Sequence, residues 1–257
     1  MTELMALEHL LRRDRLIVAA GLAAVAVLAW VYLAAGAGMD TSMADMVMMP
    51  MPWSPFSAVL VFVMWWVMMI AMMVPSAAPT VLLFTAINRK QGTAVNPSVE
   101  AWIFLGGYLL IWAGFSFAAV LAQWGLERAG LLSMAMASSS ATLGGVILLA
   151  AGVYQFTPIK RACLRYCQSP VLFLSRHWRP GVSGSLGMGF RHGSYCLGCC
   201  WFLMALLFVG GVMNLVWIAG IAAYIALEKL LPLDQRLSRA AGVGLIVSGA
   251  MALALAT

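Results

Sequence analysis

Residues 188–204, MGFRHGSYCLGCCWFLM, carry sulfur and imidazole side chains at helical spacing inside a long apolar run. Five of these side chains recur at every fourth position and a sixth lies on the same face: Met188, His192, Cys196, Cys200, Met204 and Cys199. Read as an α-helix, the segment places all six on roughly one side. Thiolate, thioether and imidazole groups are the ligands that Cu(I) and Zn(II) prefer. The stripe therefore predicts a metal site on an apolar helix, although packing alone explains any one Cys or Met taken singly.

The whole chain has the composition of an integral membrane protein. Of its 257 residues, 63% are hydrophobic and 9% are charged, whereas a soluble domain has about 25% charged residues. The net charge of +6 comes from Lys and Arg in short loops between apolar runs, which argues against nucleic acid as a partner. The five Cys are an odd number and do not resemble the framework of a disulfide-rich secreted domain. The first apolar run is long enough to span a bilayer and lacks a small-residue cleavage site, so we expect no cleavable signal peptide.

The apolar runs predict an all-α transmembrane bundle of about seven helices that forms one domain over residues 1–257. The expected spans lie near residues 16–37, 56–87, 101–122, 141–157, 186–211, 213–230 and 237–256. In this topology thirteen of the fifteen Lys and Arg fall on one side, while Arg128 lies on the other. The positive-inside rule then predicts a cytoplasmic N-terminus. We expect a multi-pass membrane protein.

Methionine is concentrated in the loop that follows the first span. Residues 39–51, MDTSMADMVMMPM, contain six Met and no Lys or Arg, so the charge rule places the loop outside the cytoplasm. Its thioethers could capture Cu(I), which binds sulfur that needs no deprotonation. A loosely ordered apolar loop, shallowly buried, is the alternative interpretation.

The second expected span continues this pattern. Met64, Met68 and Met72 lie four residues apart, and Pro75 and Pro79 follow them. Proline removes a backbone donor and crowds the preceding turn, so we expect this span to be kinked or broken midway, as helices beside transport sites often are. Packing is the alternative explanation for the Met row.

A second pair of thiols lies near the cytoplasmic end of the fourth expected span. Cys163 and Cys167 are four residues apart, and an antiparallel neighbouring helix could bring them close to the cysteines around Cys196. Four thiolates would suit Zn(II) or an iron–sulfur cluster, whereas two or three Cys with Met or His would suit Cu(I). Two unrelated groups of reduced thiols are the alternative. For Glu228 beside Lys229, a solvated helix end is favoured over a buried charge relay.

Several motifs together resemble a known family. They are MWWVMMIAMMVPSAAP (residues 64–79), GGYLLIW (106–112), AGVYQFTPIKRACLRYCQSP (151–170) and GMGFRHGSYCLGCCWFLM (187–204). With these, the chain resembles, over residues 53–232, the bacterial domain-of-unknown-function family described as predicted metal-binding integral membrane proteins. The resemblance implies metal binding without a defined activity. Because the family is bacterial, it also implies a place in the bacterial inner (cytoplasmic) membrane. It also implies a set of shared positions: Tyr154, Gln155, Cys163, Cys167, Cys196, Cys199, Cys200 and Trp201.

These observations favour a metal-binding membrane protein that handles copper in uptake, storage or delivery. The expected partners are the lipid bilayer, the metal ion and a metalloenzyme or metallochaperone. A metal-cofactor or thiol redox enzyme subunit is the first alternative, and a structural membrane subunit without metal is the second. The chain has no Walker-type loop, His-Glu-x-x-His helix or Ser-nucleophile motif, so an enzyme is the less favoured interpretation.

Overall fold

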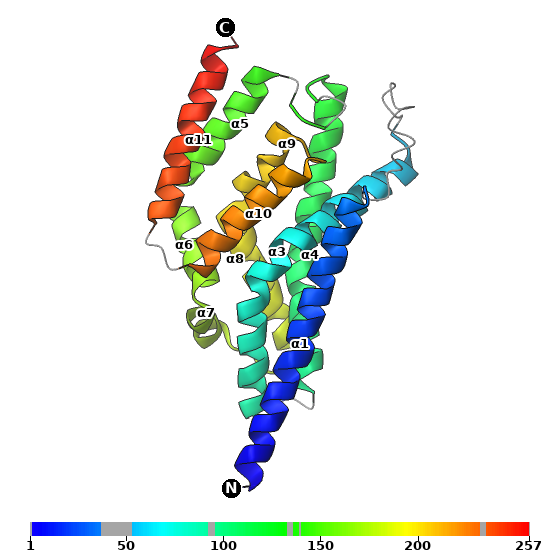
Figure 1. Cartoon of the computed structure of the whole chain (residues 1–257), viewed down its shortest axis with the longest axis vertical. Helices are drawn as coiled ribbons and strands as arrows, with labels where there is room; N and C mark the ends of the chain where they lie inside the picture. The colour runs from blue at the N-terminus through cyan, green and yellow to red at the C-terminus, as the bar shows by residue number, and fades with distance from the viewer. Residues whose placement is uncertain are drawn as a thin grey trace.

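The computed structural model describes residues 2–36, 53–91, 96–132, 136–138, 140–231 and 235–256. Every regular element in these ranges is an α-helix, apart from one isolated bridge between Leu132 and Ser138. The helices are α1 (Thr2–Ala34), α3 (Pro55–Gln91), α4 (Pro97–Arg128), α5 (Ala141–Tyr154), α6 (Pro158–Gln168), α7 (Pro170–His177), α8 (Gly181–Ala205), α9 (Leu207–Gly210), α10 (Leu215–Leu230) and α11 (Arg236–Ala254). They form an elongated bundle with the two termini at opposite ends (Figure 1). The expected all-α class is confirmed for the described part of the chain.

Fewer helices than the expected seven are long enough to cross a membrane. Within the described residues, five helical segments are sufficiently long and apolar: Arg13–Ala34, Pro55–Gln91, Pro97–Arg128, Gly181–Gly210 and Arg236–Ala254. A sixth is reached if α5 and α6, which are bent by 67° at their break, count as one broken span. The expected sixth span, near residues 213–230, forms α10, whose 16 residues rise about 24 Å, short of the roughly 30 Å hydrocarbon core.

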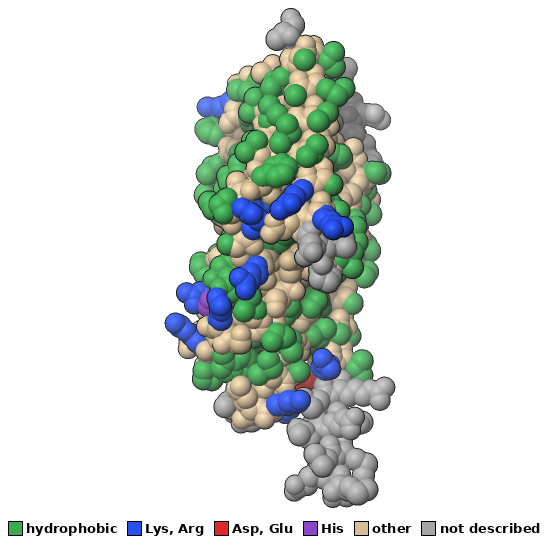
Figure 2. Space-filling model, turned by 90° about the vertical axis from the view of Figure 1, so that its left-hand side faces the viewer, with side chains coloured by type: hydrophobic (Ala, Val, Ile, Leu, Met, Phe, Trp, Pro, Cys, Tyr) green, Lys and Arg blue, Asp and Glu red, His purple; other side chains and the backbone are tan. Residues whose placement is uncertain are grey.

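Basic side chains are unevenly distributed over the surface of the bundle, whereas hydrophobic side chains occur along its whole length (Figure 2). On the face shown in Figure 2, hydrophobic side chains spread over the upper part, whereas most Lys and Arg side chains lie in the middle and lower parts. Basic residues lie in the last turns of α3, α6 and α7. In α3 they are Arg89 and Lys90.

The two prolines bend α3 without breaking it. Pro75 and Pro79 lie inside one continuous helix of 37 residues, and Figure 1 shows this helix changing direction near its middle. Each proline lacks the N–H that would bond to the carbonyl four residues earlier. Beside the prolines, the hydroxyl groups of Ser76 and Tyr108 both donate to the carbonyl of Met73, over 2.9 and 3.2 Å. The expected kink is therefore present, and a side chain of α4 binds the backbone next to it.

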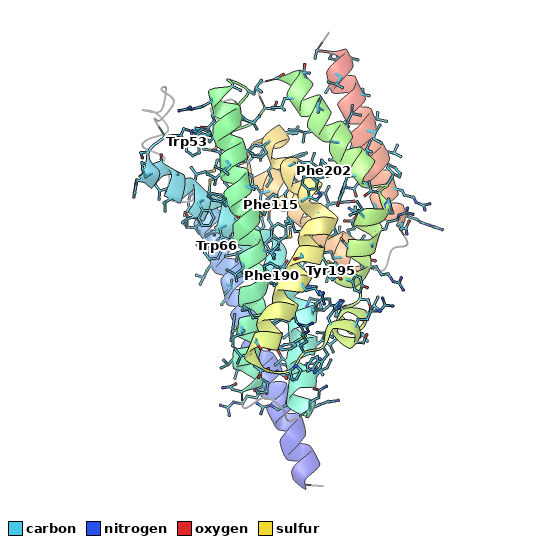
Figure 3. The ribbon with its side chains drawn as sticks, turned by 180° about the vertical axis from the view of Figure 1, so that it is seen from behind. Trp53, Trp66, Phe115, Phe190, Tyr195 and Phe202 are labelled. Atoms are coloured by element: carbon cyan, nitrogen blue, oxygen red, sulfur yellow. The ribbon has the colours of Figure 1, made fainter. Side chains whose placement is uncertain are left out.

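Glycine allows α8 to lie directly on the backbone of α4. A Cβ atom at Gly189 would lie 1.9 Å from the carbonyl oxygen of Phe104, and one at Gly107 would lie 2.3 Å from that of Leu186. Such small residues are the usual way for membrane helices to approach each other closely. Figure 3 shows α8 crossing beside α4, with Phe115 on α4 and Phe190 on α8 labelled. This contact holds α8, and with it the predicted sulfur stripe, in the centre of the bundle.

Candidate metal centre

The predicted stripe lies on one helix and points into the bundle. All six of its side chains belong to α8, and each is at most 2% exposed: Met188, His192, Cys196, Cys199, Cys200 and Met204. The sulfur and imidazole groups are thus removed from lipid and water together. The helical spacing that suggested a common face corresponds to the buried side of α8.

Cysteines from α6 and α8 lie side by side. The Sγ atoms of Cys167 and Cys199 are 4.0 Å apart. Tyr195 of α8 stacks on Tyr166 of α6 with ring centroids 4.5 Å apart, so an aromatic contact holds the two helices together here. The structure therefore brings Cys167 to the cysteines of α8. We call Cys167, Cys196, Cys199 and Cys200 the thiol cluster.

Cys163 occupies the edge of this cluster. Its Sγ atom would be 2.7 Å from a Cβ at Gly198, so the thiol rests against the backbone of α8. Unlike the four cysteines of the thiol cluster, Cys163 is partly exposed. All five cysteines are free thiols, and two sulfurs 4.0 Å apart could both reach one ion, because a metal–sulfur bond measures about 2.3 Å.

The thiols are oriented toward the backbone rather than toward a common point. Cys199 and Cys200 both donate to the carbonyl of Cys196, over 3.0 and 2.9 Å. Among the described residues, no three Cys, His, Asp or Glu side chains are arranged to hold one ion. Binding would require the thiols of Cys199 or Cys200 to rotate away from that carbonyl. The donor set fits a soft ion, and the rotation is a change of side-chain rotamer only.

A lysine, Lys229 of α10, lies between a sulfur of α3 and a sulfur of α8. Its Nζ atom donates to Cys196 Sγ over 2.9 Å, to Ser76 Oγ over 3.4 Å and to Met73 Sδ over 3.8 Å. The hydroxyl of Tyr108 lies 3.0 Å from the same Cys196 sulfur. Residues of α3, α4, α8 and α10 thus converge on one thiol.

The Met row of α3 is buried along its length. Met64, Met68 and Met72 are each at most 2% exposed, so none of them faces lipid. The thioether that reaches the Lys229–Cys196 group belongs instead to Met73, on the adjacent row. The Met-rich loop at residues 39–51 lies outside the described residues, and its expected role stays a prediction.

His192 is enclosed by aromatic rings. The ring centroids of Phe173, Tyr108 and Phe104 lie 4.9, 5.7 and 6.0 Å from that of the imidazole. Its Nδ1 atom is buried and has no hydrogen-bond partner within the described ranges. An unpaired buried nitrogen is uncommon, because burial without a partner is unfavourable. The imidazole therefore retains a free ligand atom next to the thiol cluster.

Tyr154 and Gln155, two of the three shared positions that are not cysteines, lie outside the cluster. The hydroxyl of Tyr154 donates to the carbonyl of Gly198 over 2.5 Å, and its ring packs against Phe202, which is labelled in Figure 3. The side chain of Gln155 accepts a hydrogen bond from Lys160. Neither residue contacts a cluster sulfur through a hydrogen bond that the described structure contains.

The preferred interpretation of Glu228 and Lys229 as a solvated helix end is wrong. Both are 3% exposed. Glu228 accepts from Lys160 Nζ at 2.7 Å through Oε1 and at 2.9 Å through Oε2, and it also accepts from Ser238 and Tyr224. Lys160 of α6 and Ser238 of α11 thus enclose the carboxylate of Glu228 at this end of α10. The available signal was the presence of two charges in an otherwise apolar segment.

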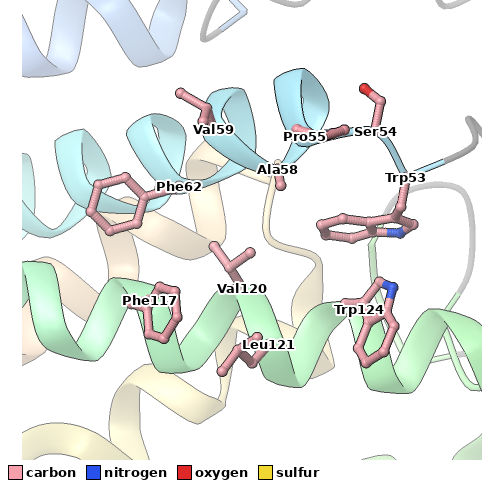
Figure 4. Close-up of a pocket in the computed structure, with 10 residues that line it drawn as sticks. All are labelled: Trp53, Ser54, Pro55, Ala58, Val59, Phe62, Phe117, Val120, Leu121 and Trp124. Atoms are coloured by element: carbon pink, nitrogen blue, oxygen red, sulfur yellow. The ribbon is translucent and has the colours of Figure 1, made fainter.

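Two hollows are present in the described part of the molecule, and no cysteine of the thiol cluster lines either of them. An apolar groove of about 540 Å³ runs between α3 and α4 and is lined by side chains that include Trp53, Phe62, Val120 and Trp124 (Figure 4). A more polar cavity of about 860 Å³ lies between α6 and the start of α11. The candidate metal centre is therefore a closed cluster inside the helix bundle.

Comparison with known families identifies the class of protein. The family model described as PpoB2, copper chaperone, matches residues 62–252, which include α4 to α10 and most of α3 and α11. No curated protein and no solved structure matches the chain. The chain belongs to this copper chaperone family, and membership implies copper binding, as the ligand types had suggested.

Proposed function

We propose that this member of the copper chaperone family takes up Cu(I) through thioethers and holds it on the thiol cluster for storage or delivery. The observation that carries the proposal is the meeting of α3 and α8 at Lys229. Met73 of the methionine-rich helix and Cys196 of the cysteine-rich helix both contact its Nζ atom. The two kinds of sulfur ligand, 123 residues apart in the chain, thus lie around one point.

Ligand strength would increase along the route. A neutral thioether binds Cu(I) weakly and exchanges it readily, whereas a thiolate binds it tightly. The proposed order is the loop at residues 39–51, then the row Met64, Met68 and Met72 with Met73 beside it, and then the thiol cluster. Met188, His192 and Met204 flank the cluster on α8 and would complete the coordination. This order favours uptake, storage or delivery over export.

The proposed direction depends on the orientation of the chain in the membrane. Basic residues lie in the last turn of α3 and in α6 and α7, and by the positive-inside rule the N-terminus and the thiol cluster would lie toward the cytoplasm. The Met-rich loop would lie on the opposite side of a bacterial inner membrane. An inverted chain would convert uptake into efflux.

Delivery would use the partly exposed edge of the site. Cys163 rests on Gly198 of α8, whose neighbours Cys199 and Cys200 belong to the thiol cluster. A thiol at this position could exchange Cu(I) with a soluble metallochaperone or a metalloenzyme, because ligand exchange requires an accessible sulfur. The partner would therefore approach α6 from the cytoplasmic side.

Metal content tests the proposal directly. The full-length protein, expressed with copper, zinc and iron available and purified in detergent, is compared with the triple variant C196S/C199S/C200S by mass spectrometry. We expect near-stoichiometric copper in the wild type and its loss in the variant. M251L serves as the control, since Met251 of α11 is 60% exposed and remote from the cluster. Wild-type protein without copper, or a triple variant that retains it, would contradict the proposal.

A thiol redox function is a second candidate, supported by the 4.0 Å separation of the Cys167 and Cys199 sulfurs. Two thiols at this distance could form a disulfide after a small movement, if their Cβ atoms can approach to about 4 Å. Counting free thiols before and after mild oxidation distinguishes the two functions. Reversible loss of two thiols without bound metal would favour redox chemistry over copper handling.

A further inference from the structure

Lys229 places a positive charge beside the thiol cluster, where the proposed ligand is itself a cation. Its side chain is 3% exposed, and its Nζ atom contacts Cys196, Met73 and Ser76. A buried charge is strongly unfavourable unless an opposite charge compensates it. The position of Lys229 therefore requires a negative partner close by.

The neighbouring carboxylate does not fill this role. Glu228 is bound by the ammonium group of Lys160 at 2.7 Å, and its oxygens also accept from Ser238 and Tyr224. The contacts of Lys229 within the described residues are with sulfur and hydroxyl groups only. Cys196, at 2.9 Å, is thus the side chain that can supply the negative charge, as a thiolate.

We propose that Lys229 is a charge-balancing residue that makes the thiol cluster select a soft monovalent cation. This inference rests on the proposed function and names its substrate class. Cu(I) held by Cys196 and a second thiolate of the cluster has a net charge of −1, which Lys229 brings to zero. The second thiol releases its proton as the ion binds, so charge and atoms balance. A divalent ion on the same two thiolates would leave an uncompensated positive charge, which the interior of a bundle disfavours.

A blocking role for Lys229 makes the opposite prediction. If its ammonium group simply occupied the position of the ion, removal of the charge would tighten metal binding. If it balances the charge, removal weakens binding of a monovalent ion and favours a divalent one. The sign of the change in affinity therefore distinguishes the two roles.

The test uses Ag(I), a monovalent ion without redox chemistry under these conditions, and Zn(II) as the divalent competitor. Affinities for both ions are measured by competition with a chelator on full-length protein in detergent. The variants are K229Q, which removes the charge, and K229R, which retains it. We expect K229Q to bind Ag(I) at least about tenfold more weakly than the wild type, because one charge at contact distance contributes more than a decade in a protein interior. K229R should remain near the wild type, and the ratio of Ag(I) to Zn(II) affinity should fall only in K229Q.

Each outcome decides between the interpretations. Tighter Ag(I) binding by K229Q, or an unchanged Ag(I) to Zn(II) ratio, would overturn the charge-balancing role while leaving copper handling intact. Absence of Ag(I) binding in the wild type would overturn both proposals. Thermal unfolding without metal reports whether K229Q is folded. If K229Q is not folded, the competition between Ag(I) and Zn(II) on the wild type tests the inference instead. Zn(II) binding that is equal to or tighter than Ag(I) binding then refutes it.

Discussion

The contact between α4 and α8 offers a sharp test of what positions the metal centre. In Gly189→Ala, the new Cβ would lie 1.9 Å from the carbonyl oxygen of Phe104, a backbone atom that cannot rotate aside. Overpacking lowers the stability of the fold by about 1–3 kcal/mol. The higher helix propensity of alanine offsets at most about 1 kcal/mol of this loss. Because the clash is with the backbone, we take the upper end of this cost and expect the free energy of unfolding to fall by about 2 kcal/mol. For a chain of this size that lowers the melting temperature by about 4–8 °C.

Thermal unfolding of detergent-purified protein measures this loss. Gly187→Ala is the matched control, because no atom lies within 4 Å of its added Cβ on the same helix. It should melt at or above the temperature of the wild type. The Gly189 variant should also separate Tyr108 from Cys196, whose side chains are 3.0 Å apart, and so weaken metal binding. If the two variants melt together, close backbone packing does not hold α8 in place and the reasoning fails.

Three further predictions concern buried charge and thiol exposure. Lys160→Met leaves the buried Glu228 carboxylate unpaired and should lower the free energy of unfolding by about 3–5 kcal/mol, measured by thermal unfolding. Adding E228Q to this variant should restore much of the lost stability. A fully additive loss in the double variant would contradict this account. Asp14→Asn breaks a partly exposed pair with Arg89, 2.5 Å long, and should cost no more than about 1 kcal/mol in the same assay. Cys163 should react fastest with a small maleimide in the native protein, because the other four cysteines are buried. Mass spectrometry measures the rate at each cysteine. Equal rates at all five would show that the thiol cluster opens readily.

The sequence pattern could predict the helices and the stripe because both follow local periodicity. The spacing of Cys196 and Cys200 places them on one face of any α-helix, and that face is the buried side of α8. The approach of Cys167 to this helix could also be expected, because a short connection makes neighbouring helices antiparallel. The number of membrane-spanning helices was less predictable, because apolar composition does not determine where α5 ends and α6 turns by 67°.

The composition of the site depended on contacts between distant segments. Met72 and Met73 are neighbours in sequence but differ by about 100° around α3, since the helix has 3.6 residues per turn. Met73 is the one of the two that points toward Lys229. Its carbonyl accepts hydrogen bonds from the hydroxyl groups of Ser76 and Tyr108. Because Tyr108 lies on another helix, this arrangement cannot be read from the sequence of α3 alone. The burial of Lys229 likewise depends on which helices cover the end of α10, which no local pattern contains.

The arrangement of buried charges bears on why the site would favour a soft ion. Glu228 directly precedes Lys229, and a free carboxylate beside the sulfur groups would attract harder, divalent ions. Lys160, Ser238 and Tyr224 instead bind both carboxylate oxygens of Glu228. Lys229 is left with the thiol of Cys196, so each buried cation has its own partner and the oxygen and sulfur ligands are kept apart. Exchange of Glu228 for Gln should therefore leave ion selectivity unchanged, whereas exchange of Lys229 should not.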